Sequence, residues 1–267
     1  MPEFPPDSVA FVTGAGSGIG LHVAKQYVTD GILKIAIIDI SNERLLETEK
    51  LLLTLSAHAK ILVIPTDCSK EAEIDAAVAK TVEEFGRIDV CCNAAGISGA
   101  RGSSTEQSTE NMMSVMQLNV MGTWWCNRAQ IKQMLKQEWR DLTTGLPFKT
   151  RGSIINVGSL LSHRAIKYGG TYAMSKHTVI GISRQDAVDY GTEGIRVNAI
   201  CPGAVRTNIF TPDVWESPLG VQLKERSALN RHGVPEEIAY LVGFLSSDKA
   251  SFITGAVYNI DGGYTAS

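Results

Sequence analysis

Short runs of apolar, β-branched residues alternate along the chain with longer segments of helical periodicity. Most of these runs are apolar throughout, as expected of parallel strands that helices cover on both faces. They span residues 9–13, 34–39, 60–65, 88–93, 152–158, 196–199 and 256–260, and the helical patterns span 19–30, 42–56, 70–86, 108–138, 171–191 and 235–247. The alternation predicts an α/β fold, a doubly wound parallel sheet of about seven strands.

Helix boundaries and connections fit one folding unit. Ser41, Thr109 and Pro235 stand where N-cap and first-turn residues belong. The irregular stretches 141–151 and 204–230 lack the composition of an interdomain linker. With 267 residues and 44% apolar content, the chain can bury a full core. We therefore expect a single domain over residues 1–267.

Charge and the first residues narrow the possible partners. A net charge of −3 and a pI near 6.0 leave no basic excess to neutralise phosphates, so neither nucleic acid nor a membrane is an expected partner. Residues 1–6 lack the basic and apolar regions of a signal peptide, and no apolar run reaches the length of a membrane span. The sequence thus predicts a cytoplasmic protein.

The cysteines predict packing rather than chemistry. They are odd in number, have no C-x-x-C spacing and lie mostly in apolar stretches, where a thiol packs as a small hydrophobe. The five are Cys68, Cys91, Cys92, Cys126 and Cys201. We assign no metal site.

A glycine-rich segment, Thr13 to Gly20, joins the first strand to the first helix. Glycines let the backbone turn tightly and approach a pyrophosphate, while the helix start offers free N–H groups and a positive dipole end. The spacing is G-x-x-x-G-x-G through Gly14, Gly18 and Gly20, which differs from the usual G-x-G-x-x-G. A phosphate-binding loop is one interpretation, and a purely structural turn is the other.

Asp39 ends the second apolar run, 19 residues after Gly20. A carboxylate there can accept hydrogen bonds from the adenosine ribose hydroxyls and would repel a 2'-phosphate. Neither Ser17 nor Ile40 supplies a compensating cation. The pattern favours NAD over NADP, with a turn-capping aspartate as the structural alternative.

Tyr172 and Lys176 are four residues apart in a predicted helix. Four positions return to the same helix face, so an ammonium can lie near the phenol and favour its deprotonated form. Such a pair can act as a catalytic acid and base, although the spacing alone is a weak signal.

Read in order, these motifs resemble those of the short-chain dehydrogenase/reductase family over nearly the whole chain. The resemblance implies a Rossmann-like single domain. Two positions depart from the family pattern, since Ala94 replaces an asparagine and Gly158 replaces a serine. The matching residues are Thr13 to Gly20, Asp67, Asn93-Ala94-Ala95-Gly96, Asn119, Ser159, Tyr172 with Lys176, Pro202-Gly203 with Thr207, and Asp261-Gly262-Gly263.

The resemblance implies a catalytic set of Asn119, Ser159, Tyr172 and Lys176. Tyr172 would transfer the proton, and Lys176 would lower its pKa and bind the nicotinamide ribose. Ser159, 13 residues before Tyr172, would hydrogen-bond the substrate oxygen. Asn119 would hold a water that connects Lys176 to solvent.

The same resemblance implies the cofactor contacts. Asp67 would meet the adenine, Asn93 would stabilise the central sheet beside the cofactor, and the turn 202–207 would meet the nicotinamide carboxamide. The full expected set is Gly14, Ser17, Gly18, Ile19, Gly20, Asp39, Ile40, Asp67, Cys68, Asn93, Ala94, Tyr172, Lys176, Pro202, Gly203, Val205 and Thr207.

The substrate side is less legible. Segment 204–230 carries apolar residues among prolines and a glycine, as in a mobile lid, or alternatively as in a packed hairpin. Loop cations could meet an anion, although solvated charge is the simpler interpretation. Trp124 and Trp125 are expected to pack in a helix. The expected substrate contacts are Ser98, Ser159, Leu161, Phe210 and Trp215, and the loop cations are Arg101, His163, Arg164 and Lys167.

Three functions follow from these residues. The leading hypothesis is an NAD-dependent oxidoreductase that interconverts a secondary alcohol and a ketone on a small, largely hydrophobic molecule. The second is an NADPH-dependent oxoacyl reductase, which Asp39 disfavours. The third is a non-catalytic dinucleotide sensor, which has no need of the four catalytic residues together. The family resemblance further implies a homotetramer, or a homodimer, with helices 108–138 and 171–191 in the interfaces.

Overall fold

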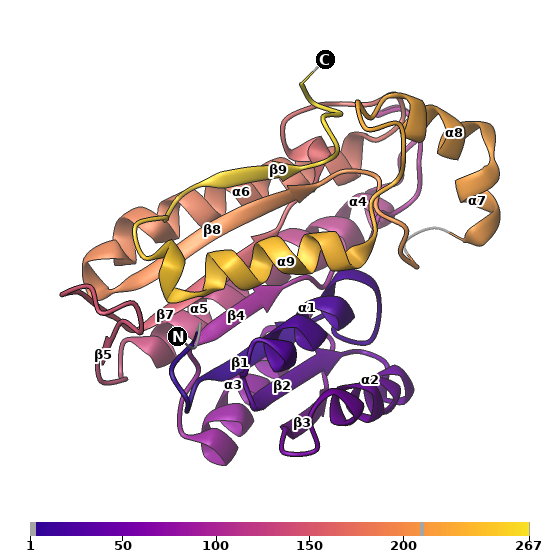
Figure 1. Ribbon diagram of the computed structural model, residues 1–267. Coiled ribbons are helices and arrows are strands. Elements are labelled where there is room, and N and C mark those ends of the chain that lie inside the picture. The colour runs from indigo at the N-terminus through magenta and orange to yellow at the C-terminus, as the bar shows by residue number, and fades with distance from the viewer. Residues whose placement is uncertain (1–3, 209–210, 267) are drawn as a thin grey trace.

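The computed structural model describes residues 4–208 and 211–266 and contains one seven-stranded parallel sheet (Figure 1). The strands lie in the order β3-β2-β1-β4-β7-β8-β9. From the boundary between β1 and β4, the chain adds strands outward first on one side of the sheet and then on the other. This arrangement confirms the predicted single-domain Rossmann-like fold. The strands are β1 (Val9–Thr13), β2 (Lys34–Asp39), β3 (Lys60–Pro65), β4 (Val90–Asn93), β7 (Gly152–Val157), β8 (Ile195–Pro202) and β9 (Val257–Ile260).

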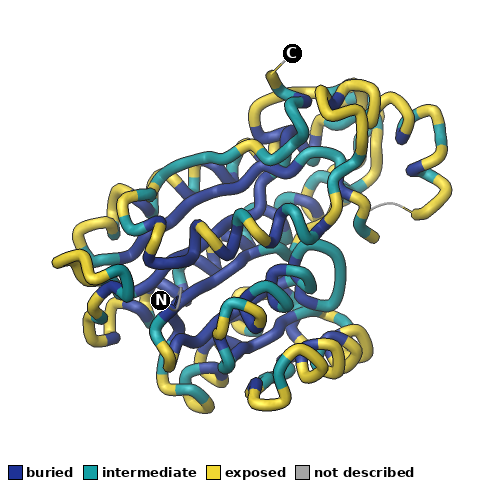
Figure 2. Tube along the Cα trace, in the orientation of Figure 1, coloured by how far each residue is buried: buried dark blue, intermediate teal, exposed yellow. Residues whose placement is uncertain are grey.

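Helices cover both faces of the sheet, and each face forms its own apolar core. One core packs α1 (Gly18–Thr29), α2 (Asn42–Leu55) and α9 (Pro235–Ser246) against the strands. The other packs α3 (Glu71–Phe85), α5 (Thr123–Met134) and α6 (Gly170–Tyr190). The central strands are buried along their whole length (Figure 2), which explains why their sequences are apolar throughout.

Three segments differ from the expected elements. The predicted helix 108–138 consists of α4 (Thr109–Met116), a π-helical turn η1 (Gln117–Gly122) and α5. Segment 141–151 contributes to a small antiparallel hairpin, and segment 204–230 contains two short helices, each beginning with a proline. These elements are β5 (Arg140–Asp141), β6 (Lys149–Thr150), α7 (Pro212–Glu216) and α8 (Pro218–Glu225), and the 3₁₀ turns are η2 (Leu160–Ser162), η3 (Gly191–Glu193) and η4 (Asp248–Ala250).

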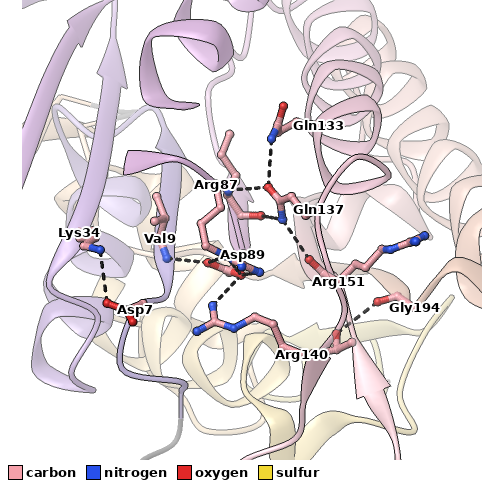
Figure 3. Close-up of polar contacts among 12 residues, drawn as sticks. Asp7, Val9, Lys34, Arg87, Asp89, Gln133, Gln137, Arg140, Arg151 and Gly194 are labelled. Carbon is pink, nitrogen blue, oxygen red and sulfur yellow. Dashed lines mark hydrogen bonds and ion pairs between the residues drawn. The ribbon is translucent and has the colours of Figure 1, made fainter. Parts of the chain in front are cut away.

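A polar cluster around Asp89 fixes the amino ends of the central strands (Figure 3). The buried Asp89 carboxylate accepts hydrogen bonds from Val9 N at 2.9 Å, Arg87 Nε at 2.8 Å and Arg140 Nη1 at 2.9 Å. Because this cluster occupies the amino edge, the carboxyl edge and its loops are left for a binding site. Within the described ranges, no helix combines the length and apolarity needed to cross a bilayer.

Candidate active site

The loops that follow β1, β4, β7 and β8 meet at the carboxyl edge of the sheet around a cavity of about 220 Å³. Ligands of open α/β sheets bind at this edge, where the strand order reverses. Apolar side chains line most of the cavity, and Tyr172 and Lys176 lie in its wall.

The glycine-rich loop is built for close backbone approach. Gly14 and Gly18 have φ angles of 67° and 52°, in the left-handed region that favours glycine. A Cβ on Gly20 would lie 2.3 Å from the carbonyl oxygen of Gly14, so no larger residue fits the turn. Ser17 precedes α1 in an extended conformation, and its side chain makes no capping hydrogen bond to that helix. The helix start therefore keeps N–H groups for an anion, and the loop fits a dinucleotide pyrophosphate.

Asp39 lies against this loop, at the carboxyl end of β2. Its Oδ2 accepts a hydrogen bond from Gly16 N at 3.1 Å and its Oδ1 accepts one from Ser41 N at 3.0 Å. A Cβ on Gly16 would lie 2.9 Å from Asp39 Cγ and 3.0 Å from Arg44 Cβ. Arg44 is a neighbour that sequence reasoning missed, although it lies in the first turn of α2, the helix that follows Asp39. Ile40 is exposed beside them.

Ser159, Tyr172 and Lys176 lie close together, and the last two line the cavity. Tyr172 shares a hydrogen bond with Ser159. Lys176 Nζ lies 5.8 Å from the centroid of the Tyr172 ring and donates a hydrogen bond to Val157 O at 2.7 Å. Ser162 ties the two segments together, because its hydroxyl accepts from Ser159 N and donates to Lys176 O.

Burial shifts the pKa values of this pair in opposite directions. Desolvation raises the pKa of Tyr172 to about 12, and the hydrogen bond with Ser159 opposes this shift. Desolvation also lowers the pKa of Lys176 to about 8. The pKa of Tyr172 is therefore raised rather than lowered as expected, because desolvation outweighs the hydrogen bond with Ser159.

Asn119 occupies the π-helical turn beneath the same site. Its side chain accepts from Ile97 N at 2.9 Å and donates to Ile97 O at 2.9 Å, which holds the loop after β4. A Cβ on Gly96 would lie 3.0 Å from Asn119 Oδ1 and 3.6 Å from Lys176 Nζ. Asn119 and Lys176 thus border the same glycine, and the water between them stays a prediction.

Asn93 turns away from the cavity into a buried polar network. Its amide nitrogen donates to Asn127 Oδ1 at 2.9 Å, Gln130 Oε1 at 3.1 Å and Asn156 Oδ1 at 3.0 Å. The network continues from Asn127 to Asp186 of α6. Sequence reasoning missed these partners, although Asn127 and Gln130 are three apart on one helix face in a core segment.

The remaining expected cofactor residues differ in position: some contact the glycine-rich loop or line the cavity, and others do neither. Thr207 reaches the glycine-rich loop, where a Cβ on Gly18 would lie 3.2 Å from Thr207 Cβ. Gly203 packs against Asp261, since its Cβ would lie 2.7 Å from Asp261 Cα. The carboxylate of Asp67 accepts two hydrogen bonds from Ser69, which lower its pKa. Ile19, Ala94, Pro202 and Val205 line the cavity, and Cys68 is buried beside Gly122.

The substrate side gathers residues from distant segments. Of the five expected contacts, Ser98, Leu161 and Trp215 line the cavity, Ser159 is not among its lining residues, and Phe210 lies outside the described residues. Leu219 and Leu223 of α8 join Trp215 of α7, so segment 204–230 does supply an apolar inner face. Sequence reasoning missed Ile166, Tyr168 and Tyr264. The sole signal for Tyr264 was its place directly after the terminal Asp261-Gly262-Gly263.

The structure also places the cysteines, the two adjacent tryptophans and the loop cations. All five cysteines are buried and unpaired, as expected. Trp125 packs in the core, and Trp124, which is 40% exposed, packs against Arg128 of the same helix, whose guanidinium carbon lies 4.9 Å from the ring centroid. Consecutive helix residues point about 100° apart, so both rings cannot face one core. Of the loop cations, Arg101 lines the cavity, whereas His163, Arg164 and Lys167 are exposed and do not.

Comparison with known proteins assigns the family. A family model described as enoyl-(acyl carrier protein) reductase matches residues 14–265. An uncharacterized oxidoreductase of Thermotoga maritima is 38% identical over 262 residues, 97% of this chain and 97% of that protein. Levodione reductase of Leifsonia aquatica is 33% identical over 266 residues, 97% of this chain and 95% of that protein.

Solved structures agree with this assignment. A crystal structure of levodione reductase superposes with a TM-score of 0.89 at 32% identity, covering 98% of both chains. A 3-ketoacyl-(acyl-carrier-protein) reductase from Brucella melitensis, complexed with NADH, has a TM-score of 0.84 at 27% identity, covering 97% of this chain and 98% of that one. The chain belongs to the short-chain dehydrogenase/reductase family. It is an oxidoreductase of a family that uses nicotinamide cofactors.

Proposed function

We propose that this protein is an NAD(H)-dependent oxidoreductase that interconverts a secondary alcohol and a ketone on a small, largely hydrophobic substrate. The observation that carries the proposal is the position of the Tyr172 phenol, which is hydrogen-bonded to Ser159, near Lys176, in the wall of an apolar cavity. Acid–base chemistry needs a proton-transferring group where the substrate oxygen will lie.

In this mechanism Ser159 donates a hydrogen bond to the substrate oxygen and holds it beside Tyr172. During alcohol oxidation, the Tyr172 phenolate takes the hydroxyl proton, and during ketone reduction the phenol returns it. The nicotinamide cofactor supplies the hydride acceptor or donor when bound. Lys176 binds the ribose hydroxyls, and Asn119 holds a water that passes protons from Lys176 to solvent.

NAD is the proposed cofactor. Asp39 directs a carboxylate at the place where the adenosine ribose would lie, and a 2'-phosphate there would meet a like charge. The Brucella relative, which is complexed with NADH, supports this choice. The cofactor contacts are proposed at the glycine-rich loop, Asp39 and the turn 202–207.

A carrier-linked oxoacyl reductase is a second candidate, because the matching family model and the Brucella relative are both described as acyl-carrier-protein reductases. The name of levodione reductase, in contrast, describes reduction of a free small molecule. The enclosed apolar cavity fits such a molecule better. A homotetramer working in the cytoplasm completes the proposal.

Substitution of Tyr172 by phenylalanine tests the proposed function. Because the phenolic oxygen carries the proton, we expect kcat to fall by at least about a hundredfold in both directions. Nicotinamide absorbance would be followed with NAD and NADP against secondary alcohols and ketones, and cofactor binding by calorimetry would show that the variant site is intact. Near-normal kcat in Tyr172→Phe would refute the assignment. Cofactor binding without turnover on any substrate would favour the sensor.

A further inference from the structure

We propose that the substrate carries a carboxylate in addition to its reacting alcohol or ketone, and that Arg101 binds this carboxylate at the rim of the cavity. The inference rests on the proposed function and names its substrate class. The substrate is thus an oxo acid or hydroxy acid with an apolar body, rather than a neutral alcohol or ketone.

The charges around the cavity favour an anion. Among the described residues, the cations that line the cavity are Arg101 and Lys176. No aspartate or glutamate of the described residues lines it. Lys176 lies at the reacting end and donates to Val157 O. Arg101 is therefore the charge available to a second group of the substrate. The rest of the lining is mostly apolar and includes Leu161, Trp215 and Leu223.

Within residues 4–208 and 211–266, Arg101 has no acidic partner. Six other arginines form ion pairs with aspartate or glutamate side chains. Among the described residues, none of the ion pairs includes Arg101. Glu106, the acid on the same loop, accepts hydrogen bonds from the backbone and side chain of Ser103 at 3.0 and 2.7 Å. An entering carboxylate thus meets a cation that no internal acid neutralises.

The guanidinium is also held in place. Its Nη2 donates to Lys167 O at 3.2 Å, across the two loops that form this rim. The same loops are joined by the parallel bridge between Gly102 and Gly169, with Gly102 N donating to Tyr168 O at 3.1 Å. The bond to Lys167 uses one of five guanidinium N–H donors, which leaves enough for a bidentate carboxylate contact.

Tyr168 provides a second sign that this rim is shaped for binding. It lines the cavity with a φ of 64°, a left-handed conformation that is unfavourable for a bulky residue. The bridge to Gly102 holds this conformation. Lys167 Nζ lies 5.0 Å from the centroid of the Tyr168 ring, which places a second cation on the rim. Backbone strain retained beside a cavity is typical of a ligand-binding position.

The test compares charged and neutral probes of equal shape. Methyl-ketone acids from 4-oxopentanoate to 8-oxononanoate, each against its methyl ester, would be assayed for kcat/KM with NADH. At the best chain length we expect the acid to exceed its ester by about tenfold or more, with the difference in KM, because a contact remote from the reacting carbon binds substrate and transition state alike. The preference should shrink as salt is added.

Arg101→Gln should remove this preference by lowering kcat/KM for the acid about tenfold to a hundredfold while leaving the ester unchanged. As a control, Lys60→Gln removes one positive charge from the exposed start of the edge strand β3 and should leave kcat/KM unchanged for both the acid and the ester. Quenching of tryptophan fluorescence, to which Trp215 in the cavity wall contributes, reports binding without turnover.

Two results would overturn the inference. In the first, acids and esters have equal kcat/KM and equal affinity in the wild-type protein. In the second, Arg101→Gln lowers kcat/KM for the acid and for its ester by the same factor. Turnover of neutral secondary alcohols without any preference for acids would refute the inference that the substrate carries a carboxylate, and would leave the proposed function intact. Absence of turnover on every alcohol and ketone would instead count against the proposed function, while the fluorescence titration still decides the role of Arg101.

Discussion

Burial acts on the two central residues of the site with opposite effects on their charged states. It favours the neutral phenol of Tyr172 and disfavours the ammonium of Lys176, the charge on which the proposed mechanism depends. The hydrogen bond from Lys176 Nζ to Val157 O offsets part of this cost. Stability and the proposed role of Lys176 therefore make opposite demands on its charge.

This competition predicts a pH effect on stability. In the unfolded chain Lys176 has the ordinary lysine pKa of 10.5, and in the folded protein about 8, so between these values the unfolded state binds more protons. Stability due to this group must therefore rise with pH across this window. Relative to Lys176→Met, the wild-type free energy of unfolding should gain about 2 kcal/mol from pH 8 to pH 10.

Chemical denaturation of both variants at each pH would measure this difference. The comparison between variants matters, because the buried cysteines, whose pKa values are raised, lower stability over the same alkaline range in both proteins. The exposed Lys60, replaced in the same way, serves as control. Parallel stability curves for the wild-type protein and Lys176→Met would contradict the prediction.

Asp39 and Arg44 predict the cofactor preference. Both border Gly16, so removing the carboxylate leaves an arginine beside the proposed ribose position. In Asp39→Ser we expect kcat/KM with NAD to fall by about tenfold to a hundredfold, and kcat/KM with NADP to rise. Adding Arg44→Ala should cancel the gain with NADP. Unchanged values for both cofactors in Asp39→Ser would rule out this role.

At the scale of elements, local sequence was enough to locate the sheet. The glycine-rich loop could be recognised because φ angles such as those of Gly14 and Gly18 are a local requirement that few other residues meet. Strand positions followed from continuous apolar runs, although β8 extends to Pro202, beyond the predicted end at residue 199. A proline can end a strand, and the three further residues, Ile200, Cys201 and Pro202, are buried between β7 and β9.

Features that depend on tertiary contacts could not be predicted in this way. The helical periodicity of residues 108–138 continues through the π-helical turn, whose cause is the distant loop that Asn119 binds. Similarly, Tyr168 and Tyr264 reach the cavity from segments about a hundred residues apart, and no local pattern marks them as neighbours. Periodicity reports which residues are buried, but not which elements meet.

The helices α7 and α8 form a cover over the cavity that is tied to the body of the protein at its far side. His232 lies against Trp215, with ring centroids 5.0 Å apart, and its Nε2 is 2.9 Å from Gly220 O. Arg206 bonds both His232 and Glu216. The cover therefore combines an apolar inner face with a polar outer attachment, which suits the proposed role of a lid.

For the whole molecule, several of the exposed apolar side chains lie on two opposite faces. Trp124 and Val188 project from α5 and α6 on one side of the sheet, and Val188 is 78% exposed. Tyr240 and Phe244 project from α9 on the other side, with Phe252 just beyond it. Single exposed apolar residues need no explanation, but two faces on opposite layers suit two different two-fold contacts.

Two such interfaces generate a tetramer, so we expect light scattering after gel filtration to give four times the chain mass of 28.8 kDa. Val188→Lys and Phe252→Lys should each reduce the tetramer to a dimer, because each places a charge in one contact, and the double variant should be monomeric. Phe148→Lys changes an exposed aromatic residue on the β5–β6 connection and should leave the mass unchanged. A monomeric wild-type protein, or a tetramer that survives both substitutions, would show that these faces do not assemble. Dimers from both single variants would establish that the two interfaces form independently.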